Sequence, residues 1–353
     1  MGIFSSLFGS RPAEPEKPEP EVNEEEAPGV ALEQLREALD SSEGALRVDG
    51  ARALIERWRA GDLQAAEAIA PRLAELLEDS EPLVRLAALG GVRLLRKPEN
   101  LEKCASAVVA LLADAVPQVR VAAVWASLRL PGDAARTQVR ALLDSAEETM
   151  RFAAACALSD ARDPAALPEL TAALHDDHRR QEALSALMSL GDAAALPEVA
   201  RLFEEESLGE FDRTLVAAAM ARFGDARGGA HLVERIEHNG DDRPIAAEWA
   251  GRLGVQEAVP ALSELADEEG DPARGAAMRA LGRLRAAGAE QRLLDVAGSD
   301  EFADDLRMDA AEGLAELGTP IAMELLKKLA EGEGSELSQL CRELLAEVAA
   351  QAS

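Results

Sequence analysis

The chain has 353 residues and a formal net charge of −29, which arises from 66 acidic and 37 basic residues. Hydrophobic residues make up 48% of the chain but aromatic residues only 3%, so a core must consist mainly of alanine, leucine and valine, as in proteins built from packed helices. The strong acidity argues against nucleic acid as a partner, because binding a phosphate backbone requires clustered positive charge.

The cysteines and the lack of long apolar segments indicate a cytoplasmic protein. Cys104, Cys156 and Cys341 are scattered and lack the spacing of metal ligands, which favours free thiols in a reducing compartment over a disulfide framework. No apolar run approaches the ~18 residues that a membrane span needs. The first ten residues also lack the cationic start of a secretion signal. We therefore expect a soluble, cytoplasmic chain without a cofactor.

Residues 1–30 differ in composition from the rest of the chain. After residue 10 they are rich in proline and glutamate and show no apolar periodicity, which predicts a disordered acidic tail. The first ten residues carry an apolar set whose spacing fits one face of a short helix, namely Ile3, Phe4, Leu7 and Phe8. This amphipathic tip could contact the inner face of a membrane, dock on a protein, or do neither, and the sequence leaves these three alternatives open.

From residue 31 to residue 353 the chain is repetitive. One arginine recurs at intervals of 29 to 38 residues and defines nine anchor positions: Arg47, Arg85, Arg120, Arg151, Arg180, Arg213, Arg243, Arg274 and Arg307. Counted from each anchor, the third and sixth residues are mostly small, and the seventh and tenth are mostly larger and apolar. These offsets fall on one stripe of an α-helix, where small residues allow neighbouring backbones to approach closely. A tenth unit has Ser338 at the anchor position.

A second amphipathic segment precedes most of the anchors. Prolines stand near the starts of these segments, where a missing amide donor costs least, at Pro71, Pro168, Pro197 and Pro260. Glycines stand near the ends of many downstream helices, where a left-handed residue suits the terminus, at Gly191, Gly224, Gly254 and Gly318. Each unit is therefore predicted to be a helix, a turn and a second helix. Since one pair cannot cover its own apolar stripe, about ten pairs must stack into a solenoid.

The repeated segments resemble the HEAT repeat family, in the short form also found in phycobilisome lyases. The resemblance is carried by residues 73–95 (LAELLEDSEPLVRLAALGGVRLL), 109–130 (VALLADAVPQVRVAAVWASLRL) and 182–199 (EALSALMSLGDAAALPEV). It implies an all-α, right-handed superhelical solenoid over residues 31–353, with the second helices lining the concave face. Such repeats serve as binding scaffolds in most proteins and as enzymes in a few, so the resemblance implies the fold more sharply than the function.

The recurring arginine is interpreted as a structural ladder. An acidic residue stands a few positions before several anchors, for example Asp79 before Arg85 and Asp114 before Arg120. Ion pairs and hydrogen bonds at each turn would then stabilise the stacked array. The residues assigned to this ladder are Arg85, Arg120, Arg151, Arg180, Arg213, Arg274 and Arg307.

Candidate catalytic and metal-binding residues are scarce. The one local cluster of metal-ligand types spans residues 175–178 (His-Asp-Asp-His), and its place in a turn without a matching partner elsewhere favours a solvated turn. Deoxyhypusine hydroxylase, a HEAT-like enzyme, builds a di-iron site from repeated His-Glu pairs, and none of the four histidines here is followed by glutamate. No nucleophile motif is recognisable. We predict no catalytic and no metal-binding residue, with a bilin-lyase-like or metal-dependent enzyme, or an enzyme subunit, as the alternative.

One apolar strip interrupts the polar face of the second helices. Positions one and five after the anchor lie opposite the core stripe, and in the second to fourth units they include Leu86, Val121, Trp125, Phe152 and Cys156. An exposed apolar patch rimmed by charge is typical of a docking surface, so we expect these residues to bind a protein partner. The alternative is that they belong to the core. For Cys156, a small apolar filler is favoured over a reactive thiol.

The same face of the seventh to ninth units carries charges of both signs, including Glu248, Arg279, Arg283 and Glu312. We interpret it as a mixed solvated surface that could also accept an acidic peptide. Together these features predict a non-catalytic scaffold that presents a concave groove to a protein partner, since a preformed groove loses little conformational entropy on binding. A regulatory subunit tethered to a membrane by its N-terminal tip stays open beside the enzyme alternative.

Overall fold

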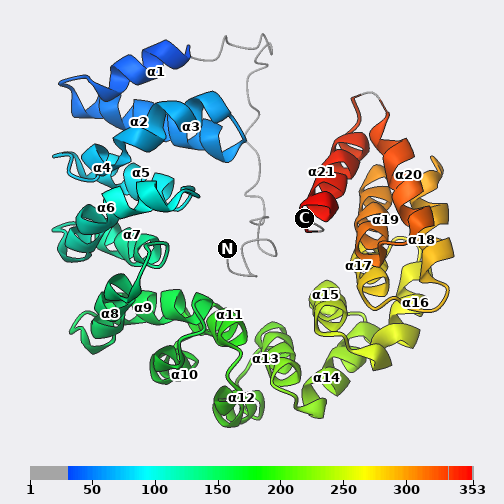
Figure 1. Ribbon diagram of the computed structural model, residues 1–353. Coiled ribbons are helices and arrows are strands. Elements are labelled where there is room, and N and C mark those ends of the chain that lie inside the picture. Colours follow the sequence, from blue (N-terminus) through cyan, green and yellow to red (C-terminus); the bar gives the residue numbers. More distant parts are fainter. Residues whose placement is uncertain (1–30, 333, 352–353) are drawn as a thin grey trace, which may run out of the picture. The chain divides into compact units, whose positions relative to one another are not determined.

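The computed structural model describes residues 31–332 and 334–351, and within them every regular element is a helix (Figure 1). The predicted tail of residues 1–30 lies outside the described residues, and so do the four tip residues Ile3, Phe4, Leu7 and Phe8. The contacts between residues divide the chain into two compact units, which we call unit 1 (up to Leu190) and unit 2 (from Gly191).

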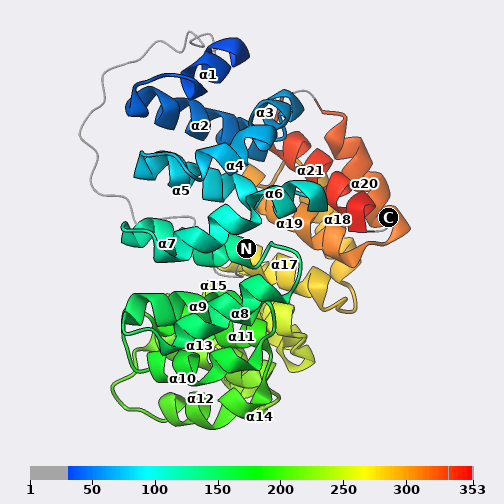
Figure 2. The same ribbon diagram turned by 60° about the vertical axis from the view of Figure 1, so that its left-hand side comes forward.

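Unit 1 contains five helix pairs. The first helices are α1 (Leu32–Leu39), α3 (Leu63–Ile69) with its continuation α4 (Leu73–Leu76), α6 (Pro98–Ala110), α8 (Asp133–Ala141) and α10 (Leu167–Ala173). The second helices are α2 (Gly44–Arg59), α5 (Pro82–Val92), α7 (Pro117–Ser127), α9 (Glu148–Asp160) and α11 (Arg180–Leu190). Each second helix packs against its own first helix and against the second helix of the next pair, so the second helices form one layer (Figures 1 and 2).

Unit 2 contains five more pairs of the same kind. The first helices are α12 (Leu196–Phe203), α14 (Ala226–Glu237), α16 (Val259–Asp267), α18 (Ala289–Gly298) and α20 (Pro320–Ala330). The second helices are α13 (Glu210–Arg222), α15 (Arg243–Leu253), α17 (Arg274–Arg283), α19 (Asp304–Leu317) and α21 (Glu336–Gln351). The described residues thus contain the expected ten pairs, and the prediction of an all-α solenoid of stacked repeats is confirmed.

The turns follow from the residues that the sequence places there. Pro168, Pro197 and Pro260 occupy the first turns of α10, α12 and α16, as predicted. Short 3-10 turns precede these helices, and side chains at the turn cap several helix starts. Asp62, for example, accepts hydrogen bonds from the backbone N–H groups of Gln64 and Ala65, which would otherwise lack partners.

Four glycines end helices or begin the following turn with left-handed backbone, as predicted. Their φ angles are +70° at Gly191, +89° at Gly224, +73° at Gly254 and +64° at Gly318. A side chain at such a position would clash with its own backbone, so glycine is favoured there. These glycines let the chain leave a second helix and enter the first helix of the next pair within a few residues.

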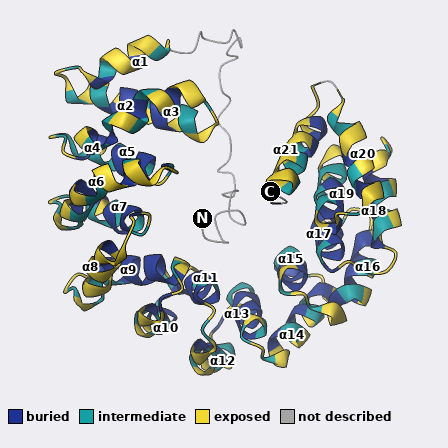
Figure 3. Ribbon diagram, viewed as in Figure 1, coloured by how far each residue is buried: buried dark blue, intermediate teal, exposed yellow. Residues whose placement is uncertain are grey.

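The predicted apolar stripe forms the core of each unit (Figure 3). In unit 1, Leu54, Leu158 and Leu187 are fully buried at the seventh position after an anchor. Burying each of these side chains stabilises the fold by ~1.5–3 kcal/mol. The small residues of the stripe, such as Ala123 and Ala154, are also fully buried and leave room for the neighbouring helix.

Unit 2 brings its second helices especially close together. A Cβ atom added to Gly282 on α17 would lie 2.7 Å from the Cα atom of Gly313 on α19. A Cβ atom added to Gly251 on α15 would lie 2.7 Å from the Cα atom of Ala280 on α17. Because real Cβ atoms do not approach other atoms this closely, the packing of α15, α17 and α19 depends on the absence of side chains at these positions.

Candidate functional site

The recurring arginines form a ladder, and each one binds carbonyl groups at the start of its own pair's turn. The Arg85 guanidinium donates hydrogen bonds to the backbone carbonyls of Asp79 and Ser80, at 2.8 and 3.2 Å. Equivalent bonds to carbonyls at the end of the first helix or in the turn are made by Arg120, Arg151, Arg180, Arg213, Arg274 and Arg307. The carbonyls at a helix end lack partners within the helix, and the arginines satisfy them.

Several ion pairs of this ladder join neighbouring helix pairs, whereas Arg180 and Arg307 pair with acids of their own turns. Asp79, which we expected to pair with Arg85, instead binds Arg47 of the preceding pair through two bonds of 2.7 and 2.8 Å. Arg85 in turn binds Asp114 of the following pair, at 2.8 and 2.9 Å. The expected pairing within a turn is therefore wrong for these residues. In Arg47 and Arg85, Nη1 donates to the carbonyls of the residue's own turn, so Nε and Nη2 face the carboxylate of the next turn.

In the tenth pair, an arginine at a different position binds the turn carbonyls. Ser338 at the anchor position donates only to the nearby carbonyl of Ser335. Arg342, one turn further along α21, donates to the carbonyls of Ala330 and Gly332 at 3.0 and 2.9 Å. Residues four positions apart lie on the same face of a helix, so the guanidinium reaches the same turn from the next position.

Three residues of the predicted apolar strip are partly exposed on the second-helix layer of unit 1. Val121 and Trp125 lie one turn apart on α7, and Leu86 lies on the adjacent helix α5. The guanidinium of Arg93 lies over the Trp125 ring, 6.0 Å from its centroid. We call Leu86, Val121 and Trp125 the docking strip. The strip presents large apolar side chains beside positive charge.

Phe152 and Cys156, the other two residues of the predicted strip, are buried. Phe152 is 7% exposed and Cys156 only 3%, on α9 between α7 and α11. The Arg179 guanidinium also lies over the Phe152 ring, 5.4 Å from its centroid. The expectation that these two side chains are exposed is therefore wrong, and neither is available to a partner in this structure.

The chemistry of Cys156 agrees with a role in packing. Burial raises the pKa of its thiol, and the nearby carboxylates of Glu182 and Asp160 raise it further. A reactive cysteine needs an accessible thiolate, which requires a lowered pKa. Cys156 is therefore a small apolar filler of the core of unit 1, as favoured from the sequence.

Unit 2 places a buried carboxylate at the position that corresponds to Trp125 and Cys156. Glu248 on α15 is 4% exposed. Its oxygens accept from Arg252 at 2.6 Å, from Arg283 at 2.5 Å and from Arg279 at 3.3 Å. The interpretation of this face as solvated is thus wrong for Glu248, because arginines from α15 and α17 cover it. We call Glu248 and these three arginines the charge network.

Burial affects the carboxylates at the centre and at the outer edge of the charge network differently. Burial disfavours ionisation of Glu248, but Arg283 and the other two arginines outweigh it and hold the pKa of Glu248 below its ordinary value. Burial raises the pKa of Asp309 on α19 even though Arg279 pairs with it. Burial also raises the pKa of Glu312, and Asp309 adds to that rise. The arginines therefore outweigh burial at Glu248, whereas burial outweighs them at Asp309 and Glu312.

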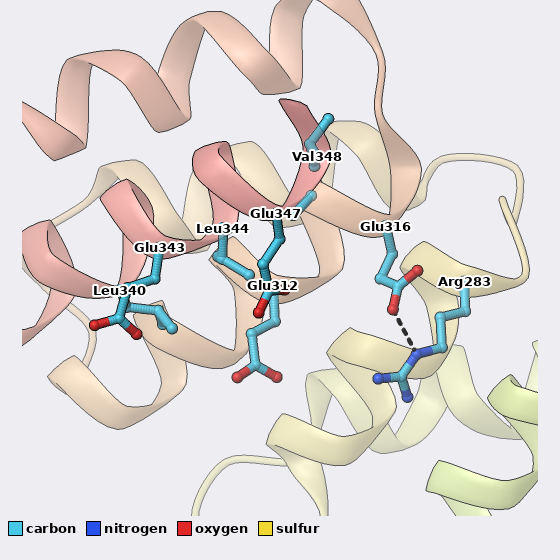
Figure 4. A pocket seen from close by; sticks show the side chains of 9 residues that line it. Arg283, Glu312, Glu316, Leu340, Glu343, Leu344, Glu347 and Val348 are labelled. Carbon is cyan, nitrogen blue, oxygen red and sulfur yellow. Dashed lines mark hydrogen bonds and ion pairs between the residues drawn. The ribbon is translucent and has the colours of Figure 1, made fainter. Parts of the chain in front are cut away.

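A groove of about 290 Å³ opens beside these carboxylates, at α19 and α21 (Figure 4). Leu340, Leu344 and Val348 line it from successive turns of α21. Carboxylates line it from both helices, namely Glu312, Glu316, Glu343 and Glu347. The lining contains one cation, Arg283, which pairs with Glu316 at 3.1 Å. We call this the acidic groove. Our reading of the sequence missed it, although the spacing of the three apolar residues on α21 was a usable signal.

Two family models match parts of the chain. Residues 105–188, which include α7 and α9, match the model for HEAT repeats, and residues 306–332 match the model for the PBS lyase HEAT-like repeat. The chain therefore contains HEAT or HEAT-like repeats in both units. The resemblance inferred from the repeated phrases is thereby confirmed. Val121 and Trp125 of the docking strip lie within the matched residues 105–188, and Leu86 precedes them.

Several solved structures resemble this HEAT-repeat chain. The CpcE–CpcF complex of phycocyanin lyase from Nostoc sp. PCC7120 shares 19% identity, with 85% of this chain and 100% of that chain covered and a TM-score of 0.39. Human deoxyhypusine hydroxylase shares 20% identity, with 70% and 96% covered and a TM-score of 0.30. The karyopherin Kap121p bound to the C-terminus of the phosphatase Cdc14p shares 15%, with 90% and 37% covered and a TM-score of 0.41. Among curated proteins no relative matches. At such identities and TM-scores the likeness says nothing about activity or partners.

The turn at residues 175–178 is held by bonds within the protein. Asp176 accepts a hydrogen bond from the backbone N–H of His178 at 2.9 Å, and Asp177 pairs with Arg180. Across residues 31–332 and 334–351, no group of three or more His, Cys, Asp or Glu side chains is arranged to hold a metal ion. Over the same residues, none of the helices combines the length and the apolar character needed to cross a membrane.

Proposed function

We propose that this HEAT-repeat protein is a non-catalytic scaffold that binds a protein partner through its second-helix layer, with the docking strip as an anchor. The observation that carries the proposal is the partly exposed Trp125, with Val121 one turn away and Leu86 on the neighbouring helix. At the position of Trp125, the next two pairs of unit 1 carry Cys156 and Ser185, which are small and buried.

The chemistry of the docking strip suits an apolar segment flanked by carboxylates. A tryptophan that becomes fully covered on binding is typical of residues that contribute ~2 kcal/mol or more to an interface. Arg93 already lies over the Trp125 ring, so part of the interface is ordered before binding. Arg52 on α2 and Arg129 in the turn after α7 are also exposed, and their charge complements an acidic partner.

The thiols of the chain support a binding role over nucleophilic catalysis. Cys104 and Cys341 are buried like Cys156, and burial raises the pKa of both thiols. Thiols of this kind do not supply a thiolate at neutral pH. A scaffold needs no such group, because its contribution is a rigid surface of defined shape and charge.

The test is affinity capture from native lysate, followed by a direct binding measurement with each purified candidate. A Val121→Glu/Trp125→Glu variant places two charges in the docking strip. The control is Leu63→Glu, because Leu63 is 75% exposed on the first-helix side of unit 1. Circular dichroism melts establish that all variants fold.

We expect a partner that binds the wild type and the Leu63→Glu variant equally and binds the strip variant at least tenfold more weakly. A photo-crosslinking amino acid at position 125 should label this partner, whereas the same group at position 63 should not. If every protein captured by the wild type binds the folded strip variant with equal affinity, the docking strip is not the anchor and the proposal fails.

A further inference from the structure

We propose that the acidic groove of unit 2 binds a basic amphipathic helix of another protein, with apolar side chains on Leu340, Leu344 and Val348 and lysine or arginine side chains on the surrounding glutamates. This inference deepens the proposed function, because it requires that the protein binds other chains. It adds a second surface, in unit 2, and names the chemistry of the partner that fits it.

The apolar side of the groove has the geometry of a helix-binding face. Leu340, Leu344 and Val348 lie at spacings of four residues along α21, so they form a continuous stripe. All three are partly exposed, and Ala315 on the packed helix α19 extends the apolar surface. A partner helix with apolar residues three and four positions apart can cover such a stripe, which is a common mode of peptide recognition.

The charges around the stripe favour a partner that carries positive charge. Glu343 and Glu347 flank it on α21, and neither forms an ion pair within the part of the chain that the structure describes. Glu312 and Glu316 flank it on α19. Arg279 lies 3.6 Å from Glu312, and the one lining cation, Arg283, is shared between Glu316 and the buried Glu248. The groove therefore has a surplus of negative charge that a cationic partner would neutralise.

The raised pKa of Glu312 also favours a cationic partner. Burial and the nearby Asp309 both disfavour a charged carboxylate at this position. A cation bound in the groove would relieve this effect and favour the ionised form. A second copy of this chain is a poor occupant, because each copy carries a net charge of −29.

The experiment uses the full chain and synthetic peptides of 18 residues. One probe places leucine on one helical face and lysine on the other, the second replaces each lysine with glutamate, and the third replaces each leucine with serine. The groove variant is Glu343→Lys/Glu347→Lys. The control is Glu264→Lys/Glu324→Lys, which makes the same charge change at two exposed positions on first helices of unit 2. Fluorescence anisotropy reports binding, and circular dichroism reports folding.

We expect the leucine–lysine peptide to bind the wild type and the control equally, and to bind the groove variant at least tenfold more weakly. Salt should weaken the binding, because the contacts involve exposed charges. The leucine–glutamate and serine–lysine peptides should bind at least tenfold more weakly than the leucine–lysine peptide. A Leu344→Ala variant should also weaken binding without changing the charge of the groove.

Two results would overturn the inference. Equal binding to the groove variant and the control would show that the net charge of the chain attracts the peptide without a defined site. Equal binding of the serine–lysine and leucine–lysine peptides would show that the apolar stripe has no role. Since all these variants leave the docking strip unchanged, they should retain any partner of unit 1, so failure here is distinguishable from failure of the proposed function.

Discussion

The second helices of unit 1 and those of unit 2 carry opposite chemistry at equivalent positions. Five residues after the anchor arginine, unit 1 carries Trp125 and Cys156, whereas unit 2 carries Glu248 and Arg279. Trp125 contributes a partly exposed ring and Cys156 a buried thiol, whereas Glu248 and Arg279 belong to the charge network. Because each pair in a solenoid contacts mainly its neighbours, the repeat specifies the backbone and leaves this position free to vary.

The two units also differ in what holds adjacent second helices together. In unit 1, Phe152 and Cys156 fill the space around α9, and the Arg85–Asp114 rung joins α5 to the following pair. In unit 2, Gly282 and Gly313 let the backbones of α17 and α19 approach closely, and the charge network spans α15 and α17. Stability should therefore respond to cavities and lost ion pairs around α5 and α9 in unit 1, and to added volume and unpaired charge around α15, α17 and α19 in unit 2.

The largest expected effect is that of removing the buried carboxylate of unit 2. A Glu248→Ala variant leaves three arginines without their common partner, and loss of one member of a buried ion pair costs ~3–5 kcal/mol. The matched change in unit 1, Cys156→Ala, removes only a small apolar group and should cost ~1 kcal/mol. Guanidinium unfolding followed by circular dichroism measures both. Equal losses in the two variants would contradict the comparison.

A somewhat smaller loss of stability is expected when one ion pair of the arginine ladder, that between Arg85 and Asp114, is weakened. Arg85 makes two bonds to Asp114 and two to turn carbonyls, and the point charge of lysine cannot reproduce this fork. Arg85→Lys should therefore lower the free energy of unfolding by ~1.5–3 kcal/mol. The control Arg52→Lys changes an exposed residue and should stay within ~0.5 kcal/mol of the wild type. If lysine is tolerated equally at both positions, the rung has no stabilising role.

Added volume should have opposite effects in the two units. Gly282→Ala places a methyl group against the backbone of Gly313, and such overpacking costs ~1–3 kcal/mol. Gly90→Ala on α5 in unit 1 meets no atom within 4 Å, and alanine in a helix interior is favoured over glycine by ~0.5–1 kcal/mol. Thermal and chemical unfolding should thus show one destabilised and one stabilised variant. The same sign in both would mean that the close approach in unit 2 relaxes freely.

The sequence was sufficient to predict the repeat architecture, because the signal recurs in every pair. The anchors, the small residues of the stripe, and the glycines at Gly191 and Gly254 each carry a local physical meaning that neighbouring pairs repeat. A wrong assignment in one helix pair can therefore be corrected by comparison with the other pairs. The pairing of Asp79 with Arg47 was not predictable in this way, since sequence distance favours Arg85 and only the fold shows which guanidinium edge faces the carboxylate.

The exposed positions were harder to predict than the core. Phe152, Glu248 and Trp125 lie at equivalent or adjacent offsets on the same face, yet the first two are buried and the third is partly exposed. The difference depends on how closely neighbouring second helices approach and on which long side chains fold over them, as Arg179 does over Phe152. Helical periodicity describes a single helix and contains no information on these distances.

The smallest expected effect concerns pH, and the two kinds of carboxylate in unit 2 give opposite signs. Asp309 and Glu312 have raised pKa values, so the folded state takes up protons at higher pH than the unfolded chain does. Their stabilising contribution is present at low pH and is lost as the pH rises through the ordinary carboxyl range to the folded pKa. Glu248 has a lowered pKa, so its contribution is present above the ordinary carboxyl range and is lost as the pH falls through the folded pKa.

When the pH is lowered from 7 to 5, the protonation of Asp309 and Glu312 therefore dominates the change in stability. An Asp309→Asn/Glu312→Gln variant keeps the hydrogen-bonding shape but cannot take up protons, so its melting temperature should rise ~1–3 °C less than that of the wild type over this interval. A Glu301→Gln/Glu324→Gln control removes two exposed charges, and its melting temperature should follow that of the wild type. This control separates the effect of the two buried carboxylates from the weaker charge repulsion that any chain with a net charge of −29 experiences at lower pH. Parallel melting curves for all three proteins would show that burial of Asp309 and Glu312 does not govern their protonation. Below the ordinary carboxyl range all three should lose stability together, because Glu248 and its arginines are unchanged in each.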